Sequence, residues 1–237
     1  MRIELDGICK AFGSVQANSN ISLTVESGTI HGLLGENGAG KTTLMKVLTG
    51  YISCDSGSIY LDGRLVKVGS PAVATRLGIG MLHQDPLDVP RLSVLQNFSL
   101  GAPGFSALHR HQTRQKLLEL CQRFGFDLDP DELVRNLTMG ERQQLEMLRL
   151  LSMGVRTIIL DEPTTGISEP QRVLLFKTLH KLANDGLSII FVSHKLKEVQ
   201  ELCSEVTVLR GGRVSGRIHA PFTSDALVQM MFGQCLS

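Results

Sequence analysis

The chain has 237 residues, which at about 150 residues per domain fits one large domain or two small ones. Its 24 lysines and arginines balance 23 aspartates and glutamates, so the formal net charge of +1 argues against a nucleic-acid binder that depends on bulk positive charge. No apolar run approaches the roughly 18 residues of a membrane-spanning helix. Five scattered cysteines without CxxC spacing indicate neither a disulfide framework nor a zinc site, and no signal peptide is recognisable.

The first 85 residues combine strand and helix patterns. Short alternating segments at residues 2–6 and 21–26 predict antiparallel strands. An apolar strand at residues 29–34 leads into a glycine-rich loop and then a helix that Gly50 can end. The stretch IYLDGRLVKV predicts a hairpin that turns at Asp62 and Gly63, and residues 77–82 predict another strand.

From residue 86 to about residue 151 the pattern is mainly helical, and beyond it strands and helices alternate again. Strands are expected at residues 155–162 and 187–194, helices at 169–186 and 195–203, and a last strand pair around Gly211 and Gly212. This order predicts an α/β fold with a mainly parallel sheet, an antiparallel β subdomain near the N-terminus and an inserted α-helical subdomain. We expect a single domain over residues 1–237, with the helical subdomain at about 86–151.

The strongest motif is GENGAGKTT, which matches GxxxxGK[ST] between a predicted strand and a predicted helix. Glycines let successive backbone N–H groups point at phosphate oxygens, and the following helix contributes its positive end. Lys41 can reach the β and γ phosphates, while the Thr42 hydroxyl can bind Mg²⁺. The motif predicts a P-loop NTPase core whose phosphate-binding residues are Gly35, Asn37, Gly38, Ala39, Gly40, Lys41, Thr42 and Thr43.

Two acids follow the predicted strand at residues 157–160. Ligands of parallel sheets bind at the carboxyl ends of the strands, so Asp161 is expected to hold the Mg²⁺ shell. Glu162 is placed to orient or deprotonate an attacking water. Alone, such a pair is as often a solvated strand end, but together with the phosphate loop it indicates a catalytic site.

The segment LTMGERQ, residues 137–143, precedes that strand and begins a helix. It resembles the signature motif of ATP-binding cassette (ABC) ATPases, whose usual form is LSGGQ. Thr138 keeps the hydroxyl and Gly140 the close approach, whereas Met139 and Glu141 depart from the usual residues. Thr138 and Glu141 also form a T-x-x-E capping box, which would explain this segment without any ligand.

Other residues occur in the order typical of ABC ATPases, and the resemblance covers essentially the whole chain. It implies that Phe12, in KAFG, stacks on adenine. It implies that Gln84 is the Q-loop glutamine, which touches Mg²⁺ and the attacking water and relays the state of the site to a membrane partner. It also implies that His194 is the switch histidine bonded to the γ-phosphate, and that Lys41, Gln84, Glu162 and His194 form the catalytic set.

The stretches SPAVATRLGIGMLHQDPLDVPRLSVLQNFSLG and FVSHKLKEV resemble the sugar and nucleoside importer branch, in which LSVGE-like signatures are ordinary. That resemblance implies a subunit that uses ATP and Mg²⁺ to power solute import. Its expected partners are a transmembrane permease, a second cassette as a homodimer or as a fused or paired unit, and indirectly a solute-binding protein. No nucleic-acid partner is expected, and the expected location is peripheral, on the cytoplasmic side of the plasma (inner) membrane.

Alternatives stay open at this point. The chain could be a soluble ABC ATPase not tied to transport, a regulatory nucleotide-binding cassette, or a small-molecule kinase. The short stretch between Lys41 and Asp161 leaves no room for the long coiled coil of chromosome-maintenance ATPases, and Glu162 with His194 disfavours a purely regulatory role. Ser168 stands where many ABC proteins have an aspartate, and it makes an S-x-x-Q capping box with Gln171. Residues 109–116, HRHQTRQK, are interpreted as a solvated helix face rather than a metal site.

Overall fold

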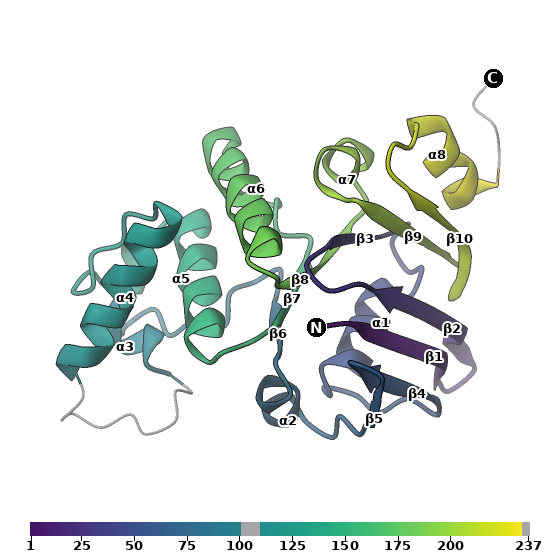
Figure 1. The fold of residues 1–237 in the computed structure, drawn as a ribbon, viewed down its shortest axis with the longest axis horizontal. Coiled ribbons are helices and arrows are strands. Elements are labelled where there is room, and N and C mark those ends of the chain that lie inside the picture. Colours follow the sequence, from purple (N-terminus) through teal and green to yellow (C-terminus); the bar gives the residue numbers. More distant parts are fainter. Residues whose placement is uncertain (101–109, 234–237) are drawn as a thin grey trace.

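The computed structural model describes residues 1–100 and 110–233, whose strands form two sheets (Figure 1). One is four-stranded in the order β2-β1-β4-β5, and the other is six-stranded in the order β10-β9-β3-β8-β7-β6. The strands are β1 (Ile3–Phe12), β2 (Val15–Val25), β3 (Ile30–Gly35), β4 (Ser56–Leu61), β5 (Arg64–Val66), β6 (Ile79–Leu82), β7 (Thr157–Asp161), β8 (Ser188–Ser193), β9 (Glu205–Arg210) and β10 (Arg213–His219).

The four-stranded sheet is antiparallel, as the sequence predicts. The predicted hairpin is confirmed, because β4 and β5 are joined by Asp62 and Gly63, with φ values of 49° and 77°. Two positive φ angles in a two-residue loop match the right-handed twist of the flanking strands.

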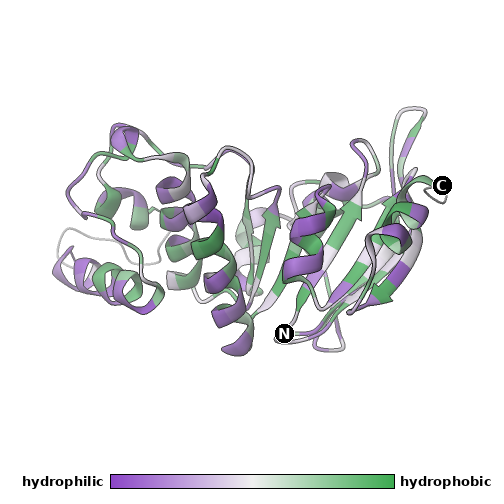
Figure 2. Cartoon of the chain, turned by 90° about the horizontal axis from the view of Figure 1, so that it is seen from above, coloured by the Kyte–Doolittle hydropathy of each residue, from purple (hydrophilic) through white to green (hydrophobic). Residues whose placement is uncertain are grey.

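The six-stranded sheet is mainly parallel, with only β10 antiparallel to its neighbour β9. Its side chains enter two separate cores. In β8, Ile190 and Val192 face helix α1 (Lys41–Leu48) and the antiparallel sheet, whereas Ile189 and Phe191 face the helices on the other side. Burial on both faces explains why the central strands are continuously apolar, visible as green arrows in Figure 2.

Helices cover the second face of this sheet. These are α6 (Glu169–Asn184), α7 (Leu196–Leu202) and α8 (Ser224–Phe232), which lie along the upper edge in Figure 1. All three bury apolar residues against the sheet. The expected α/β architecture is confirmed.

Between β6 and β7 the described chain is helical and lies to one side of the sheets, at the left in Figure 1. Leu117 and Phe124 pack with Phe98 and Leu145 in its interior. Arg114 forms an exposed ion pair with Asp131, as expected for a solvated helix face, while His109 of the same stretch lies outside the described residues. The elements are α3 (Val94–Phe98), α4 (Arg110–Phe124), the 3₁₀ turn η2 (Val134–Asn136) and α5 (Met139–Ser152).

Two helices are missing from the sequence prediction, although each has a start signal. Helix α2 (Pro71–Arg76) begins after Ser70, whose hydroxyl accepts from the Val73 N–H, with proline in its first turn. Helix α8 begins after Thr223 and ends at Gly233 in the left-handed conformation. Strands β1 and β2 are also longer than predicted, because register shifts interrupt their alternating pattern.

A buried histidine occupies the end of the parallel sheet opposite the glycine-rich loop. His31 on β3 is fully buried, and its Nε2 lies 2.9 Å from the Thr207 hydroxyl. Its Nδ1 lies 3.5 Å from Glu205, which is also approached by Arg217 and His219 of β10. Burial lowers the pKa of His31 from 6.5 to about 4. The folded protein therefore holds this imidazole neutral at pH 7.

We expect the contribution of His31 to the free energy of unfolding to decrease as the pH falls from 6.5 towards 4. In this window the unfolded chain binds a proton at His31 and the folded chain does not, so about 3 kcal/mol is lost by pH 4. Urea denaturation at a series of pH values measures this slope. A His31→Gln variant lacks this contribution but keeps the opposite one of Glu146, whose raised pKa favours the folded state as the pH falls. The free energy of unfolding of the original chain should therefore fall relative to that of the variant between pH 6.5 and 4.5. Equal slopes in the two proteins would contradict the assignment.

Candidate nucleotide site

A cavity of about 620 Å³ lies beyond the carboxyl ends of the parallel strands. Most of the predicted phosphate-binding and catalytic residues line it together: Asn37, Gly38, Ala39, Gly40, Lys41, Thr42, Thr43, Gln84, Asp161 and Glu162. Segments remote in sequence therefore converge on one space, as expected for a ligand site of a parallel sheet. Five further lining residues are absent from the site predicted from the sequence: Val15, Gln16, Ala17, Gly211 and Gly212.

The glycine-rich loop depends on a glycine immediately before α1. Gly40 has a φ of 98°, and a Cβ there would lie 2.4 Å from the Ala17 carbonyl oxygen. Any side chain would thus meet both backbone strain and a clash. This close approach brings the start of β2 against the phosphate loop.

Lys41 points back into its own loop. Its Nζ donates to the carbonyl oxygens of Gly35, at 2.8 Å, and Glu36, at 2.9 Å. Burial lowers the pKa of Lys41, while the neighbouring carboxylates of Glu162 and Asp161 act against that shift. The ammonium group is thereby held beside the backbone N–H groups that would contact a phosphate.

The two acids at the carboxyl end of β7, Asp161 as its last residue and Glu162 directly after it, have different surroundings. Asp161 is buried and accepts a hydrogen bond of 3.1 Å from the Thr42 hydroxyl, and burial raises its pKa. Glu162 adopts a positive φ of 51°, and its Oε1 lies 2.8 Å from the Nδ1 of His194. A non-glycine residue in this conformation carries a backbone cost that recurs at functional sites.

The Thr42 and Asp161 oxygens fit a magnesium ion. Mg²⁺ prefers oxygen ligands, keeps several waters and is usually held by one or two carboxylates together with substrate phosphates. The Thr42 hydroxyl and the Asp161 carboxylate are 3.1 Å apart, and Gln84 lines the same cavity.

Strand β2 and the β9–β10 turn support the phosphate loop through hydrogen bonds. The Asn18 side-chain amide donates to the Gly40 carbonyl at 3.1 Å. The Gly212 N–H donates to Ala39, and the Ser19 N–H donates to Gly212, at 3.2 and 2.8 Å. The Gly-Gly pair is recognisable in the sequence as a turn, but nothing in the local pattern indicates that this turn reaches residue 39.

Five of the predicted residues do not line the cavity: Phe12, Gly35, Thr138, Gly140 and His194. Phe12 is 49% exposed near the tip of the β1–β2 hairpin, where it pairs with Val15, a residue that does line the cavity. Gly35 is the last residue of β3. His194 is connected to the site through its contact with Glu162, which lines the cavity. Thr138 and Gly140 start α5, away from this cavity, and the capping box predicted for Thr138 is confirmed.

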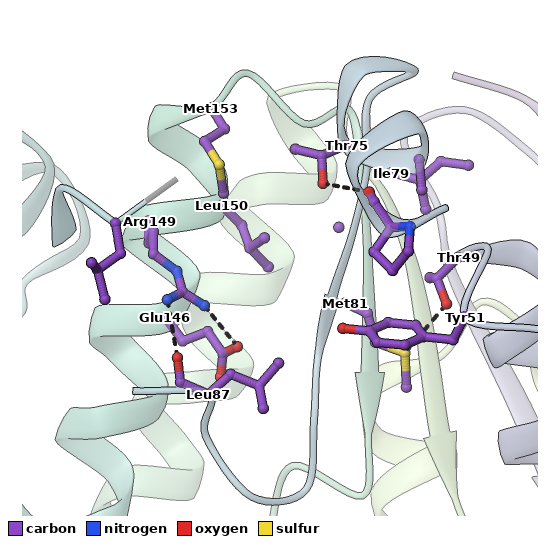
Figure 3. A pocket seen from close by; sticks show the side chains of 14 residues that line it. Thr49, Tyr51, Thr75, Ile79, Met81, Leu87, Glu146, Arg149, Leu150 and Met153 are labelled. Carbon is purple, nitrogen blue, oxygen red and sulfur yellow. Dashed lines mark hydrogen bonds and ion pairs between the residues drawn. The ribbon is translucent and has the colours of Figure 1, made fainter. Parts of the chain in front are cut away.

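A second hollow, of about 350 Å³, lies between the sheet and the helices of residues 94–152 (Figure 3). Tyr51 and Met81 line one wall, and Leu87 and Glu146 line the other. Glu146 is only 4% exposed, and its Oε1 accepts from Arg149 at 3.2 Å, while its Oε2 has no hydrogen-bond partner among the described residues. Burial raises the pKa of Glu146 to about 7, with Arg149 acting against the shift. We call this hollow the lateral groove.

The sequence model of the family described as "ABC transporter" matches residues 18–165, which include the phosphate loop, the signature segment and both acids. The chain belongs to the ABC transporter family. It is 39% identical to "Ribose import ATP-binding protein RbsA" of Caldanaerobacter subterraneus, covering 98% of this chain and 48% of that protein. It is 35% identical to "Nucleoside import ATP-binding protein NupA" of Lactococcus lactis, covering 99% and 47%. The chain spans about half the length of these curated relatives.

Solved structures of ABC cassettes share the fold. The ADP conformation of MJ1267, an ATP-binding cassette of an ABC transporter, aligns with a TM-score of 0.85 over 99% of this chain and 100% of that chain, at 22% identity. The dimeric structure of MJ0796 bound to ADP and Pi aligns with a TM-score of 0.79 at 21% identity. The ABC family and the P-loop fold expected from the sequence are both confirmed.

Proposed function

We propose that this chain is an ATP-hydrolysing ABC cassette that powers import of a sugar or nucleoside through a membrane permease. The convergence of Lys41, Thr42, Asp161 and Glu162 on one cavity carries the proposal. In this proposal, residues 1–237 form one nucleotide-binding domain, and residues from 86 to about 151 form its helical insertion. The names of the ribose and nucleoside import relatives support the solute class.

Within one cassette, each side chain has a separate task. Lys41 exchanges its two loop carbonyls for the β and γ phosphates, and the loop N–H groups hold the remaining phosphate oxygens. Thr42, Asp161 and Gln84 would hold Mg²⁺, which would neutralise charge on the phosphates. Phe12, beside Val15 at the cavity mouth, stacks on the adenine ring.

Glu162 orients and deprotonates the water that attacks the γ-phosphate. His194 holds the Glu162 carboxylate through Nδ1, at 2.8 Å, and presents its other nitrogen to the phosphate. Because Glu162 follows a rigid, fully buried strand, its carboxylate is set by the backbone rather than by a flexible loop. Such preorganisation lowers the cost of arranging the attacking water.

The site is completed by a second cassette. Thr138 and Gly140 begin a helix whose N-terminus lies away from its own cavity, so they serve the phosphate of a partner cassette in a head-to-tail pair. The helix N–H groups and the Thr138 hydroxyl supply further donors to the γ-phosphate. The partner is another copy, or a second cassette in the same or a paired chain, which the double length of the relatives supports.

Transport requires a membrane partner. No helix in the described ranges is long and apolar enough to cross a bilayer. We assign the lateral groove to the permease, because its apolar walls border both β6, which leads to Gln84, and α5, which begins at the signature segment. The chain then works on the cytoplasmic face of the plasma (inner) membrane, with a solute-binding protein acting on the permease.

A charge placed at the mouth of the lateral groove should uncouple the cassette from its permease. Leu87 is 53% exposed there, and its carbonyl, not its side chain, receives the hydrogen bond from Arg149. We expect Leu87→Glu to reduce the permease recovered with the tagged chain about tenfold or more, while ATP binding stays unchanged. Leu65→Glu, at a 67% exposed leucine on β5, is the matched control. Recovery of the unaltered chain without any permease from native membranes would favour the soluble alternative.

A further inference from the structure

Helices α5 and α6 begin side by side, and one side chain joins their first turns. Each helix starts with a capping box, Thr138 with Glu141 in α5 and Ser168 with Gln171 in α6. The Gln171 Oε1 accepts from the Ser168 N–H at 2.9 Å and from its hydroxyl at 3.1 Å. The Gln171 Nε2 donates to the Thr138 hydroxyl oxygen at 3.0 Å. Gln171 therefore caps its own helix and reaches the cap of the other.

The Thr138 hydroxyl has its full hydrogen-bonding capacity in use. A hydroxyl carries one proton and two lone pairs. The lone pairs of Thr138 Oγ1 receive the Gln171 amide and the Glu141 backbone N–H, the latter at 3.4 Å. The proton goes to Glu141 Oε2 at 2.7 Å, and the same oxygen also accepts from the Thr138 backbone N–H at 2.7 Å. Two donors at the head of α5 are thus occupied by one carboxylate oxygen.

A phosphate oxygen can accept from the same two donors, the backbone N–H and the hydroxyl of Thr138. It accepts hydrogen bonds as a carboxylate does, and the Gln171 amide leaves the Thr138 hydroxyl able to act only as a donor. We propose that Glu141 is an internal substitute for phosphate: its carboxylate occupies the N–H and hydroxyl of Thr138 until the ATP of a partner cassette displaces it. Gln171 is the positioning residue, because its amide keeps the Thr138 hydroxyl acting as a donor. The inference rests on the head-to-tail pairing proposed above.

Glycine at position 140 makes this arrangement sterically possible. A Cβ at Gly140 would lie 2.6 Å from the Gln171 side-chain carbon and amide nitrogen. The absence of that Cβ lets Gln171 pass over the first turn of α5 to Thr138. Gly140 thus has a role inside its own cassette in addition to its role towards the partner's phosphate.

The ATP concentration at half-maximal dimer formation tests the inference. We would measure it by light scattering on the 237-residue chain carrying Glu162→Gln, so that bound ATP persists. Adding Glu141→Gln keeps the capping box but weakens the competing acceptor and removes its charge. We expect the half-maximal ATP concentration to fall about tenfold, the size of one hydrogen bond to a charged group. Adding Gln171→Glu keeps the cap of α6 but replaces the amide donor with an acceptor, and should raise this concentration about tenfold.

Glu169→Gln is the matched control, because it removes the same charge from the first turn of α6, where Glu169 pairs with Arg172 and not with Thr138. It should leave the half-maximal ATP concentration unchanged, and thermal midpoints should verify that all variants are folded. An unchanged or raised concentration in the folded Glu141→Gln variant would overturn this inference alone. No ATP-dependent dimer in any of the chains would overturn the head-to-tail pairing and this inference with it.

Discussion

Replacing Glu162 with glutamine is expected to lower the rate of ATP hydrolysis about 10²- to 10⁴-fold, the usual contribution of a general base. Glutamine has nearly the same shape and can still contact His194, but it cannot take a proton from water. ATP binding should remain, because in the proposed site the loop before α1, and not this side chain, holds the phosphates. Phosphate release in steady state, together with nucleotide titration, separates the two effects.

Glu36→Gln provides the control for charge. Glu36 is exposed in the phosphate loop, and only its backbone carbonyl contacts Lys41. This variant removes the same charge near the same cavity and should hydrolyse ATP at close to the original rate. Wild-type hydrolysis by the Glu162→Gln chain would show that another group deprotonates the water.

Replacing Lys41 with alanine is expected to weaken ATP binding about 10²-fold. In the proposed site the ammonium group makes charged hydrogen bonds to two phosphates of ATP, and each such bond contributes about 1.5–3 kcal/mol. Without ATP the same group donates to the Gly35 and Glu36 carbonyls, so the loss of these two hydrogen bonds offsets part of the free energy gained on binding ATP. Calorimetric titration with ATP measures the loss directly.

Lys46→Ala is the matched control for Lys41→Ala. Both lysines belong to α1, but the Lys46 side chain is exposed and does not line the cavity. Its removal should change ATP affinity by less than about twofold. An equal loss in both variants would indicate that net charge, rather than the position of Lys41, controls binding.

Local motifs predict those parts of the site that the chain builds over short distances. The phosphate loop, the acids at the carboxyl end of β7 and both capping boxes are each contiguous in sequence, and each needs only its own segment to form. The continuous burial of the central strands likewise follows from their apolar composition. These are the features that the structure reproduces most closely.

The long-range contacts of the site could not be predicted from the sequence. Nothing near Gly212 indicates that its N–H will reach the Ala39 carbonyl, and nothing near Gln171 indicates a bond to Thr138. Both contacts depend on how separate elements are placed by the sheets. The exposure of Phe12 could not be predicted from the sequence either. The position of the hairpin tip depends on bulges between β1 and β2, and these bulges interrupt the alternating pattern.

The hydrogen bond from Gly212 to the phosphate loop indicates how far along the chain the nucleotide site extends. The family match stops at residue 165, yet His194 and Gly212 lie well past that point and take part in the site. A recombinant fragment cut at residue 165 would keep the phosphate loop, the signature segment and both acids, but it would lose His194 and the wall formed by the β9–β10 turn. Expression boundaries for this cassette should therefore follow the sheet and include β10, whatever the extent of the sequence match.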